Sequence, residues 1–188
     1  SRIALEIEKL HERLTTDDFL GKGSIAVTEV YFTGPSQCAV PDSARIHLDR
    51  RLTWGETKES AVEEVREACM LAGHPDAHIE VLTYNEAAYT GLVYPTEKYY
   101  PTWITQADSP WVKAAETAFQ SSLGRKPVVD KWTFSTNGVA IAGMHQVPCI
   151  GLGPGNEELA HAPNEAVPIE HLNEAAAFYA ALIYTLKA

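Results

Sequence analysis

The chain has 188 residues, of which 45% are apolar, and a formal net charge of −10 at pH 7. This length allows one domain or two small ones, and the apolar fraction is normal for a globular protein with a core of its own. The acidic balance disfavours nucleic acid and acidic lipid surfaces as partners, because no basic patch is large enough to neutralise phosphates. No apolar run approaches the roughly 20 residues that span a bilayer, and the first residues lack the apolar stretch of a signal peptide, so we expect a soluble chain without membrane contact.

The cysteines are odd in number and far apart. Cys38, Cys69 and Cys149 show no C-x-x-C spacing. This pattern argues against a disulfide framework and against a zinc site built from cysteines. We therefore expect each cysteine to be a small buried apolar side chain, in a protein of the reducing cytoplasm.

The first half of the chain alternates between helical and strand patterns. Apolar residues at helical spacing begin at Ile3, and Thr57 and Gly73 have the character of residues that start and stop a second helix. We expect a helix over 3–14, two antiparallel strands over 24–33 and 44–53, a helix between Thr57 and Gly73, and a strand over 78–84.

The predicted strand over 44–53 has one apolar and one polar face, with Arg50 interrupting the apolar one. A solvated sheet surface is the simplest interpretation of Arg45 and His47 on the polar face. We expect the Arg50 side chain to reach solvent past the edge of the sheet.

The second half begins with a stretch, 91–108, that lacks periodicity and suggests a crossing between two lobes. Ser109 and Pro110 then predict the start of a helix that Gly124 ends. We expect two short buried strands over 128–132 and 147–152, and a last helix over 169–186.

Residues 151–165 read Gly-Leu-Gly-Pro-Gly-Asn-Glu-Glu-Leu-Ala-His-Ala-Pro-Asn-Glu and place His161 on a turn-rich loop. A lone loop histidine is more often a surface or locally hydrogen-bonded residue than a metal ligand. The glycines do not form a phosphate loop, because their spacing is not G-x-G-x-x-G and because Glu157 and Glu158 would repel phosphate.

The string Ala-His-Ala-Pro-Asn-Glu at 160–165, after a Gly-Pro-Gly turn, resembles the C-terminal metal-ligand motif of the co-catalytic dizinc amidohydrolases and metallopeptidases. That family includes acetylornithine deacetylase, succinyl-diaminopimelate desuccinylase, aminoacylase and the glutamate carboxypeptidases. The resemblance implies that His161 binds one of two zinc ions, with Co²⁺ or Mn²⁺ as alternatives.

Two other segments match the same family. Asp49-Arg50-Arg51 resembles an Asp-x-Arg at the end of a strand, whose arginine binds the substrate carboxylate, and the match falls on Arg51. The resemblance also assigns substrate binding to a loop formed by Ser135, Thr136, Asn137 and Gly138. Two departures concern the substrate pocket: Cys38 stands where many members have an asparagine, and Val139 replaces the second glycine of Ser-Thr-x-Gly-Gly.

The fold that the resemblance implies is α/β combined with α+β. Residues 1–92 would form an incomplete ferredoxin-like lid domain that lacks its first strand and makes a homodimer, and residues 93–188 would be the C-terminal part of a zinc-peptidase-like α/β catalytic domain.

The remaining metal ligands and the general base of the family have no counterpart in the chain. We therefore expect no catalytic residue here, an inactive isolated chain, and a longer enzyme with two zinc ions per subunit. That enzyme would use metal-activated water to hydrolyse an amide bond of an N-acyl amino acid, a short peptide or a related compound with a carboxylate. The alternatives are a non-catalytic dimerisation or binding module that retains the fold, and an α/β domain that binds an organic anion through Arg51.

Overall fold

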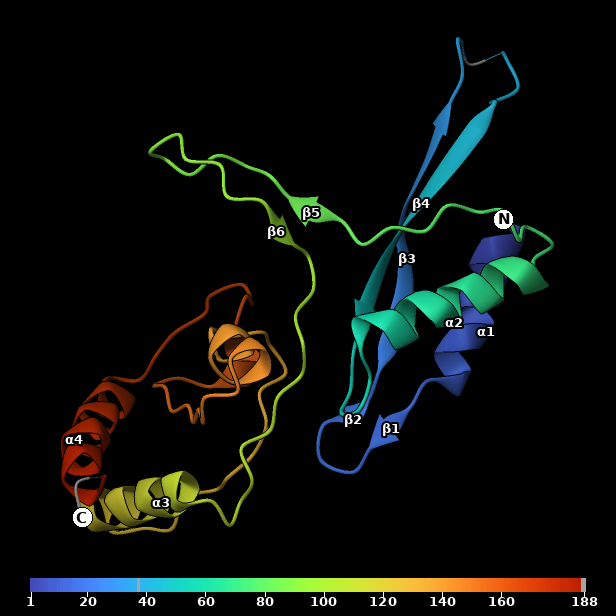
Figure 1. Ribbon diagram of the computed structural model, residues 1–188. Coiled ribbons are helices and arrows are strands. Elements are labelled where there is room, and N and C mark those ends of the chain that lie inside the picture. The colour runs from blue at the N-terminus through green and yellow to red at the C-terminus, as the bar shows by residue number, and fades with distance from the viewer. Residues whose placement is uncertain (37, 187–188) are drawn as a thin grey trace. The chain divides into compact units, whose positions relative to one another are not determined.

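The computed structural model describes residues 1–36 and 38–186, which form two compact units (Figure 1). The first unit is Ser1–Thr102 and the second is Trp103–Ala188. The division falls later than the boundary at residue 92 that the sequence suggested. The assignment of these units to a lid and a catalytic domain stays a prediction.

Over its described residues, the first unit combines two helices with three antiparallel strand pairs, of which the β3–β4 pair is long. In chain order its elements are α1 (Arg2–Arg13), β1 (Thr16–Asp17), β2 (Gly21–Lys22), β3 (Ser24–Thr33), β4 (Ser43–Arg51), α2 (Lys58–Leu71), β5 (Thr83–Tyr84) and β6 (Thr96–Glu97). The pairs are β1 with β2, β3 with β4, and β5 with β6. The predicted pairing of β3 with β4 is confirmed, and Ile25 lies opposite Arg50 in their register.

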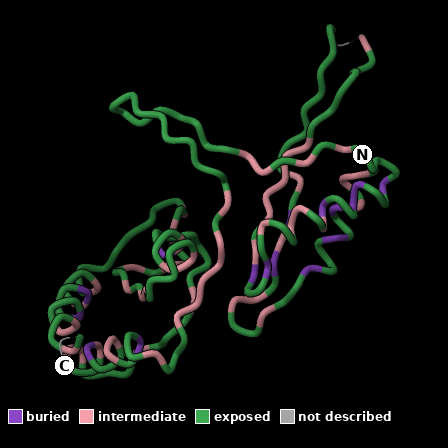
Figure 2. Tube along the Cα trace, in the orientation of Figure 1, coloured by how far each residue is buried: buried purple, intermediate pink, exposed green. Residues whose placement is uncertain are grey.

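The core of the first unit lies between α1, α2 and the base of the β3–β4 hairpin (Figure 2). The helical spacing of α1 brings its apolar side chains to one face, where they meet those of α2 and β3. The residues of this core are Ile7, Leu10, Leu14, Ile25, Val65, Ala68 and Cys69. The outer part of the hairpin projects beyond the helices, and Phe32 there is 70% exposed.

The ends of α2 are those that the sequence predicted. Thr57 Oγ1 accepts a hydrogen bond from the Ser60 backbone N–H (3.2 Å), and Ser60 Oγ accepts one from the Thr57 N–H (2.9 Å). This reciprocal pair satisfies two of the unpaired N–H groups at the start of the helix. Gly73 follows the helix with φ +80°, a conformation that glycine adopts without a steric penalty.

The expectation that Arg50 reaches solvent is wrong. Its side chain is only 10% exposed, and Nη2 donates to Glu56 Oε1 (2.5 Å) and to Glu64 Oε2 (2.9 Å). Nη1 donates to the Arg51 carbonyl (2.5 Å). Side chains alternate between the two faces of the strand, and this places Arg50 on the face toward the helices. Two carboxylates there balance its positive charge. Glu56 also accepts the Thr53 backbone N–H (2.7 Å), which joins the turn after β4 to the same network.

Three predicted strands are wrong in whole or in part. Of 78–84 only Thr83–Tyr84 is a strand, and 128–132 and 147–152 contain none. A strand exists by hydrogen bonding to a neighbour, and no other described segment runs beside these residues as a strand. The predicted burial of the last two segments is wrong as well, since Val128 is 90% and Val147 51% exposed.

The second unit consists of helices and irregular loops. Its elements are α3 (Pro110–Leu123), the π-helix η1 (Val139–Met144), the 3₁₀ helix η2 (Glu157–Leu159) and α4 (Ile169–Thr185). α3 begins and ends as predicted, with Ser109 Oγ accepting the Val112 N–H (3.3 Å) and Gly124 at φ +69°. α3 and α4 pack side by side, and the rings of Phe119 and Phe178 meet with centroids 6.1 Å apart.

Burial of the cysteines is confirmed for Cys69 and wrong for Cys38. Cys38 is exposed, since it lies between the two strands of the projecting hairpin, and Cys149 is half-buried; all three are free. Burial raises the pKa of the Cys69 thiol and so disfavours the reactive thiolate.

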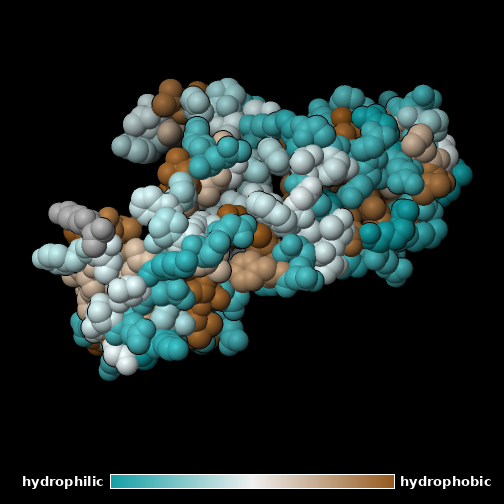
Figure 3. Space-filling model, turned by 60° about the horizontal axis from the view of Figure 1, so that its bottom comes forward, coloured by the Kyte–Doolittle hydropathy of each residue, from teal (hydrophilic) through white to brown (hydrophobic). Residues whose placement is uncertain are grey.

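Apolar side chains also occur at the surface, shown in brown among hydrophilic ones in Figure 3. In the second unit Ile169 is 72% and Tyr184 79% exposed, both on α4. None of the helices in the described ranges is long and apolar enough to cross a bilayer.

We predict that Arg50→Ala destabilises the chain by about 3–5 kcal/mol, because it leaves Glu56 as a buried carboxylate without its cation. Urea unfolding measures this loss. Arg45→Ala removes an arginine from the exposed face of the same strand and should change stability by less than about 0.5 kcal/mol. Equal effects of the two substitutions would contradict the role of the buried network.

Candidate metal and substrate site

The loop that carries His161 is held by its own backbone and by one carboxylate. His161 and Asn164 both adopt left-handed backbone conformations, with φ +62° and +64°. Such values are uncommon outside glycine, although asparagine and histidine tolerate them best. The His161 backbone N–H donates to Glu165 Oε2 (3.1 Å), which closes the loop on itself. A strained and internally bonded loop of this kind is typical of a site that must present one side chain in a fixed direction.

The His161 imidazole is exposed and meets the ring of Phe134 edge-on. The ring centroids are 5.4 Å apart and the planes make an angle of 85°. Within residues 1–36 and 38–186, neither ring nitrogen of His161 has a hydrogen-bond partner. An imidazole with free nitrogens fits the requirement for a zinc ligand.

No three His, Cys, Asp or Glu side chains of the described residues gather as a metal site. A catalytic zinc normally has three protein ligands. His161 can therefore serve as one ligand of such a site, and the described residues do not complete it.

The predicted substrate loop, residues 135–138, lies next to His161. Phe134 directly precedes this loop, and its ring contacts the His161 imidazole. Ser135, Thr136 and Asn137 are exposed, and Thr136 Oγ1 accepts the Gly138 N–H (3.1 Å). The Ser135 hydroxyl and the Asn137 amide have no partner among the described residues, so both can donate to a bound carboxylate. The structure thus brings together two of the three groups that the sequence assigned to the site.

Gly138 is required by packing, since its φ of −56° is open to any residue. A Cβ added there would lie 2.3 Å from Cζ2 of Trp103 and 2.6 Å from Cε2. The indole of Trp103 therefore supports this loop directly. No local pattern in the sequence points to Trp103, because the contact joins residues that are far apart in the chain.

Glu157 joins the loop before Ser135 to the loop of His161. One of its carboxylate oxygens accepts the Thr133 backbone N–H (2.7 Å) and also the Thr133 hydroxyl. These hydrogen bonds from Thr133 hold the pKa of Glu157 below its ordinary value. The sequence had suggested only that Glu157 would repel phosphate.

Arg51, the third predicted group, belongs to the first unit, whereas His161 belongs to the second. Its side chain is 67% exposed and forms a two-point ion pair with Asp49, Nε to Oδ1 (2.8 Å) and Nη2 to Oδ2 (3.1 Å). An exposed ion pair contributes little stability and is screened by salt. The guanidinium is therefore oriented by Asp49, in a pair that is weak enough for another carboxylate to displace.

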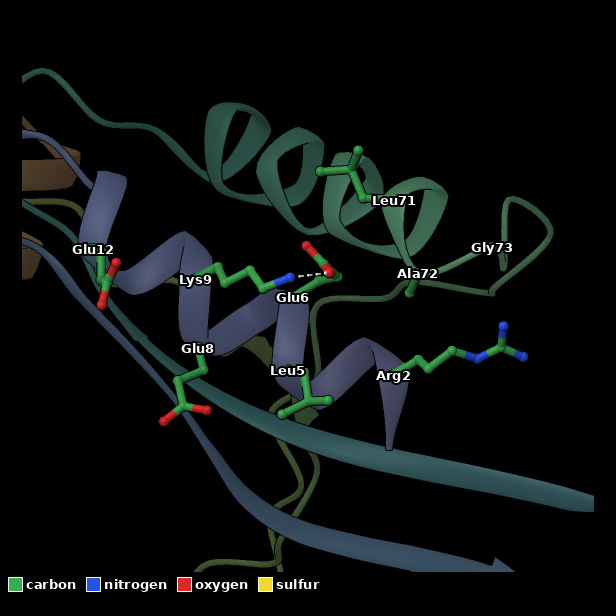
Figure 4. A pocket seen from close by; sticks show the side chains of 9 residues that line it. All are labelled: Arg2, Leu5, Glu6, Glu8, Lys9, Glu12, Leu71, Ala72 and Gly73. Atoms are coloured by element: carbon green, nitrogen blue, oxygen red, sulfur yellow. Dashed lines mark hydrogen bonds and ion pairs between the residues drawn. The ribbon is translucent and has the colours of Figure 1, made fainter.

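Two hollows lie elsewhere and include neither His161 nor Arg51. One, of about 470 Å³, lies on α1 beside the end of α2, where Lys9 pairs with Glu6 (2.7 Å) among further acidic side chains (Figure 4). The other, of about 250 Å³, lies between α3, α4 and residues 152–155. In it, Nδ1 of His171 accepts the Gly155 N–H (3.3 Å), which ties the glycine turn to α4.

Comparison with known proteins decides the family. The profile of Peptidase family M20/M25/M40 matches residues 14–185, which is most of the chain. The chain belongs to this peptidase family. The resemblance suggested by the His161 motif is thereby confirmed, together with the peptidase-like α/β fold; the details of a lid domain stay a prediction.

Two curated proteins are similar over nearly the whole of this chain. Two proteins called "uncharacterized protein YgeY", from Escherichia coli strain K12 and from Escherichia coli O157:H7, are each 51% identical over 177 residues. The match covers 94% of this chain and 44% of each relative, so the chain spans less than half the length of these curated relatives.

A solved structure supports the fold. The M20 family metallo-carboxypeptidase Sso-CP2 from Sulfolobus solfataricus aligns with a TM-score of 0.56 and 20% identity. The alignment covers 96% of this chain and 42% of that one. At this identity the likeness extends to the fold alone.

We predict that Gly138→Ala destabilises the second unit by about 1–3 kcal/mol, because the added methyl group collides with Trp103. Gly153→Ala is the matched control, since a Cβ there meets nothing within 4 Å. Thermal unfolding of both variants tests the contact. A Gly138→Ala variant as stable as Gly153→Ala would show that the indole does not support this loop.

Proposed function

We propose that this chain is part of a metal-dependent hydrolase that cleaves an amide bond of an N-acyl amino acid, a short peptide or a related compound with a carboxylate. The observation that carries the proposal is the His161 imidazole, whose nitrogens lack a described partner and whose ring meets Phe134 at the start of the 134–138 loop. Membership of the M20/M25/M40 family supports it.

In this proposal His161 is one ligand of a site for two zinc ions per subunit, with Co²⁺ or Mn²⁺ as alternatives. The other ligands and the general base would come from the portion of the relatives' length that this chain does not match. When bound, zinc supplies a Lewis acid that makes water an effective nucleophile near neutral pH.

The residues of this chain would bind and orient the substrate. Ser135, Thr136 and Asn137 present hydroxyl and amide donors next to Phe134, and Gly138 keeps the loop close to Trp103. Arg51, oriented by Asp49, would pair with the substrate carboxylate through two parallel hydrogen bonds.

We also propose a homodimer formed through the first unit, and a cytoplasmic location. The hairpin of β3 and β4 has no further strand beside it among the described residues, and such edges pair readily with another chain. A non-catalytic dimerisation or binding module is the second candidate. The open edge of the β3–β4 hairpin among the described residues fits this candidate as well.

In a protein of the relatives' full length, His161→Ala should remove about one zinc per subunit and nearly all hydrolysis of N-acetyl amino acids and dipeptides, because the ion loses a ligand. Metal analysis by mass spectrometry and a hydrolysis assay measure both effects. His74→Ala and His78→Ala change exposed histidines of the first unit and should alter neither. Equal zinc content in the wild type and His161→Ala would refute the metal assignment and leave the non-catalytic module.

Arg51→Ala in the same protein should raise KM by about 10- to 100-fold with unchanged zinc content, because a charge-assisted pair with the substrate is lost. Steady-state kinetics on a substrate with a free carboxylate, and on the same substrate with that carboxylate capped as an amide, test this. Arg45→Ala, on the same face of β4, serves as the control. A loss of equal size with substrates whose carboxylate is capped as an amide would contradict the role of Arg51.

A further inference from the structure

We propose that Glu157 and Thr133 form a positioning clamp that sets the distance between the 134–138 loop and His161. The inference rests on the proposed function, since it assigns the clamp to the alignment of substrate with the metal ligand. Neither residue would touch the substrate or the metal.

The hydrogen bonds of the clamp join the start of the 134–138 loop to the start of the His161 loop. Thr133 directly precedes Phe134, and Glu157 begins η2, the short helix that leads into the loop of His161. A single oxygen, Glu157 Oε1, accepts both the backbone N–H and the hydroxyl of Thr133. Two bonds from one residue to one ionised oxygen fix an orientation as well as a distance. The ring contact of Phe134 with His161 lies just beyond this anchor.

The Glu157 side chain is not needed to build its own helix. η2 is closed by backbone bonds from Leu159 N to Asn156 O (3.0 Å) and from Ala160 N to Glu157 O (3.0 Å). Asn156 Oδ1 caps it by accepting the Glu158 N–H (3.1 Å). The carboxylate of Glu157 is therefore directed entirely toward the other loop.

The charge state of Glu157 suits this task. The hydrogen bonds from Thr133 lower the pKa of its carboxyl group, against the opposing effects of partial burial and, more weakly, of nearby Asp130. The carboxylate is thus ionised at neutral pH, where its hydrogen bonds from Thr133 are charge-assisted. Small errors in alignment are costly in a hydrolase, where a displacement of about 1 Å can reduce the rate 100-fold.

The test uses a protein of the relatives' full length and compares Glu157→Ala and Thr133→Val with three controls. Glu157→Gln retains an oxygen that accepts both hydrogen bonds, Thr133→Ser retains both donors, and Glu158→Ala removes the neighbouring carboxylate. The first readout is the NMR signal of the His161 ring in metal-free protein, assigned by its loss in His161→Ala. The Phe134 ring shifts this signal, and Phe134→Leu gives its position without that shift.

We expect Glu157→Ala and Thr133→Val to move the His161 signal toward its position in Phe134→Leu, and to lower kcat/KM by about 10- to 100-fold with unchanged zinc content. Glu157→Gln and Thr133→Ser should recover most of both effects, and Glu158→Ala should show neither. An unmoved His161 signal in both clamp variants, or an equal movement in Glu158→Ala, would overturn the clamp.

Two further outcomes keep a failure of the clamp distinct from a failure of folding or of the proposed function. If Glu157→Ala does not fold, Thr133→Val decides alone, since it removes only one hydroxyl. If wild-type protein binds no zinc through His161, the proposed function fails, whereas the His161 signal still decides whether the clamp exists.

Discussion

The first unit depends on the ion pairs that the buried guanidinium of Arg50 makes with two glutamates. A charge inside a core is costly unless oppositely charged groups surround it, and here Glu56 and Glu64 do so from the turn after β4 and from α2. The network therefore joins three successive segments of the chain. It also fixes the register of β4, because a slip of one residue would exchange the two faces of the strand. Successive side chains of a strand point to opposite faces, so the burial of Arg50 leaves Arg51 on the exposed face.

The α-helices could be predicted from the sequence because their signals are local, whereas the short helices η1 and η2 were not predicted. Thr57, Ser109 and Gly124 act within one turn of the helix that they start or end. The strands are different, since their hydrogen bonds go to residues that the local pattern does not identify. The β3–β4 hairpin was predictable because its two strands follow one another directly along the chain, whereas 128–132 and 147–152 have apolar patterns and no partner strand among the described residues. The burial of Arg50 depends on Glu56 and Glu64, and nothing in the strand itself indicates them.

The candidate site shows the same contrast. His161 was found from a motif of six consecutive residues, and the 135–138 loop from a likeness in sequence. Trp103, Thr133 and Glu157 were missed, because each acts through a residue far from it in the chain. In a sequence, a glycine such as Gly138 suggests a tight turn. In the structure, position 138 requires glycine because the Trp103 indole leaves no space for a Cβ. The sequence therefore indicates which groups present chemistry, and the structure indicates which groups hold them in place.

The pairing of Arg51 with Asp49 has a consequence for how an anion would be recognised. In the proposed function an incoming carboxylate displaces Asp49, which already binds the exposed guanidinium with the same two-point geometry. Binding at Arg51 is then an exchange of partners, in which one ion pair is broken as another forms. Salt screens both pairs alike, so this step should depend less on ionic strength than the formation of a new ion pair would. Asp49 would thus compete with the ligand for Arg51. A ligand would stay bound only if it made further contacts elsewhere.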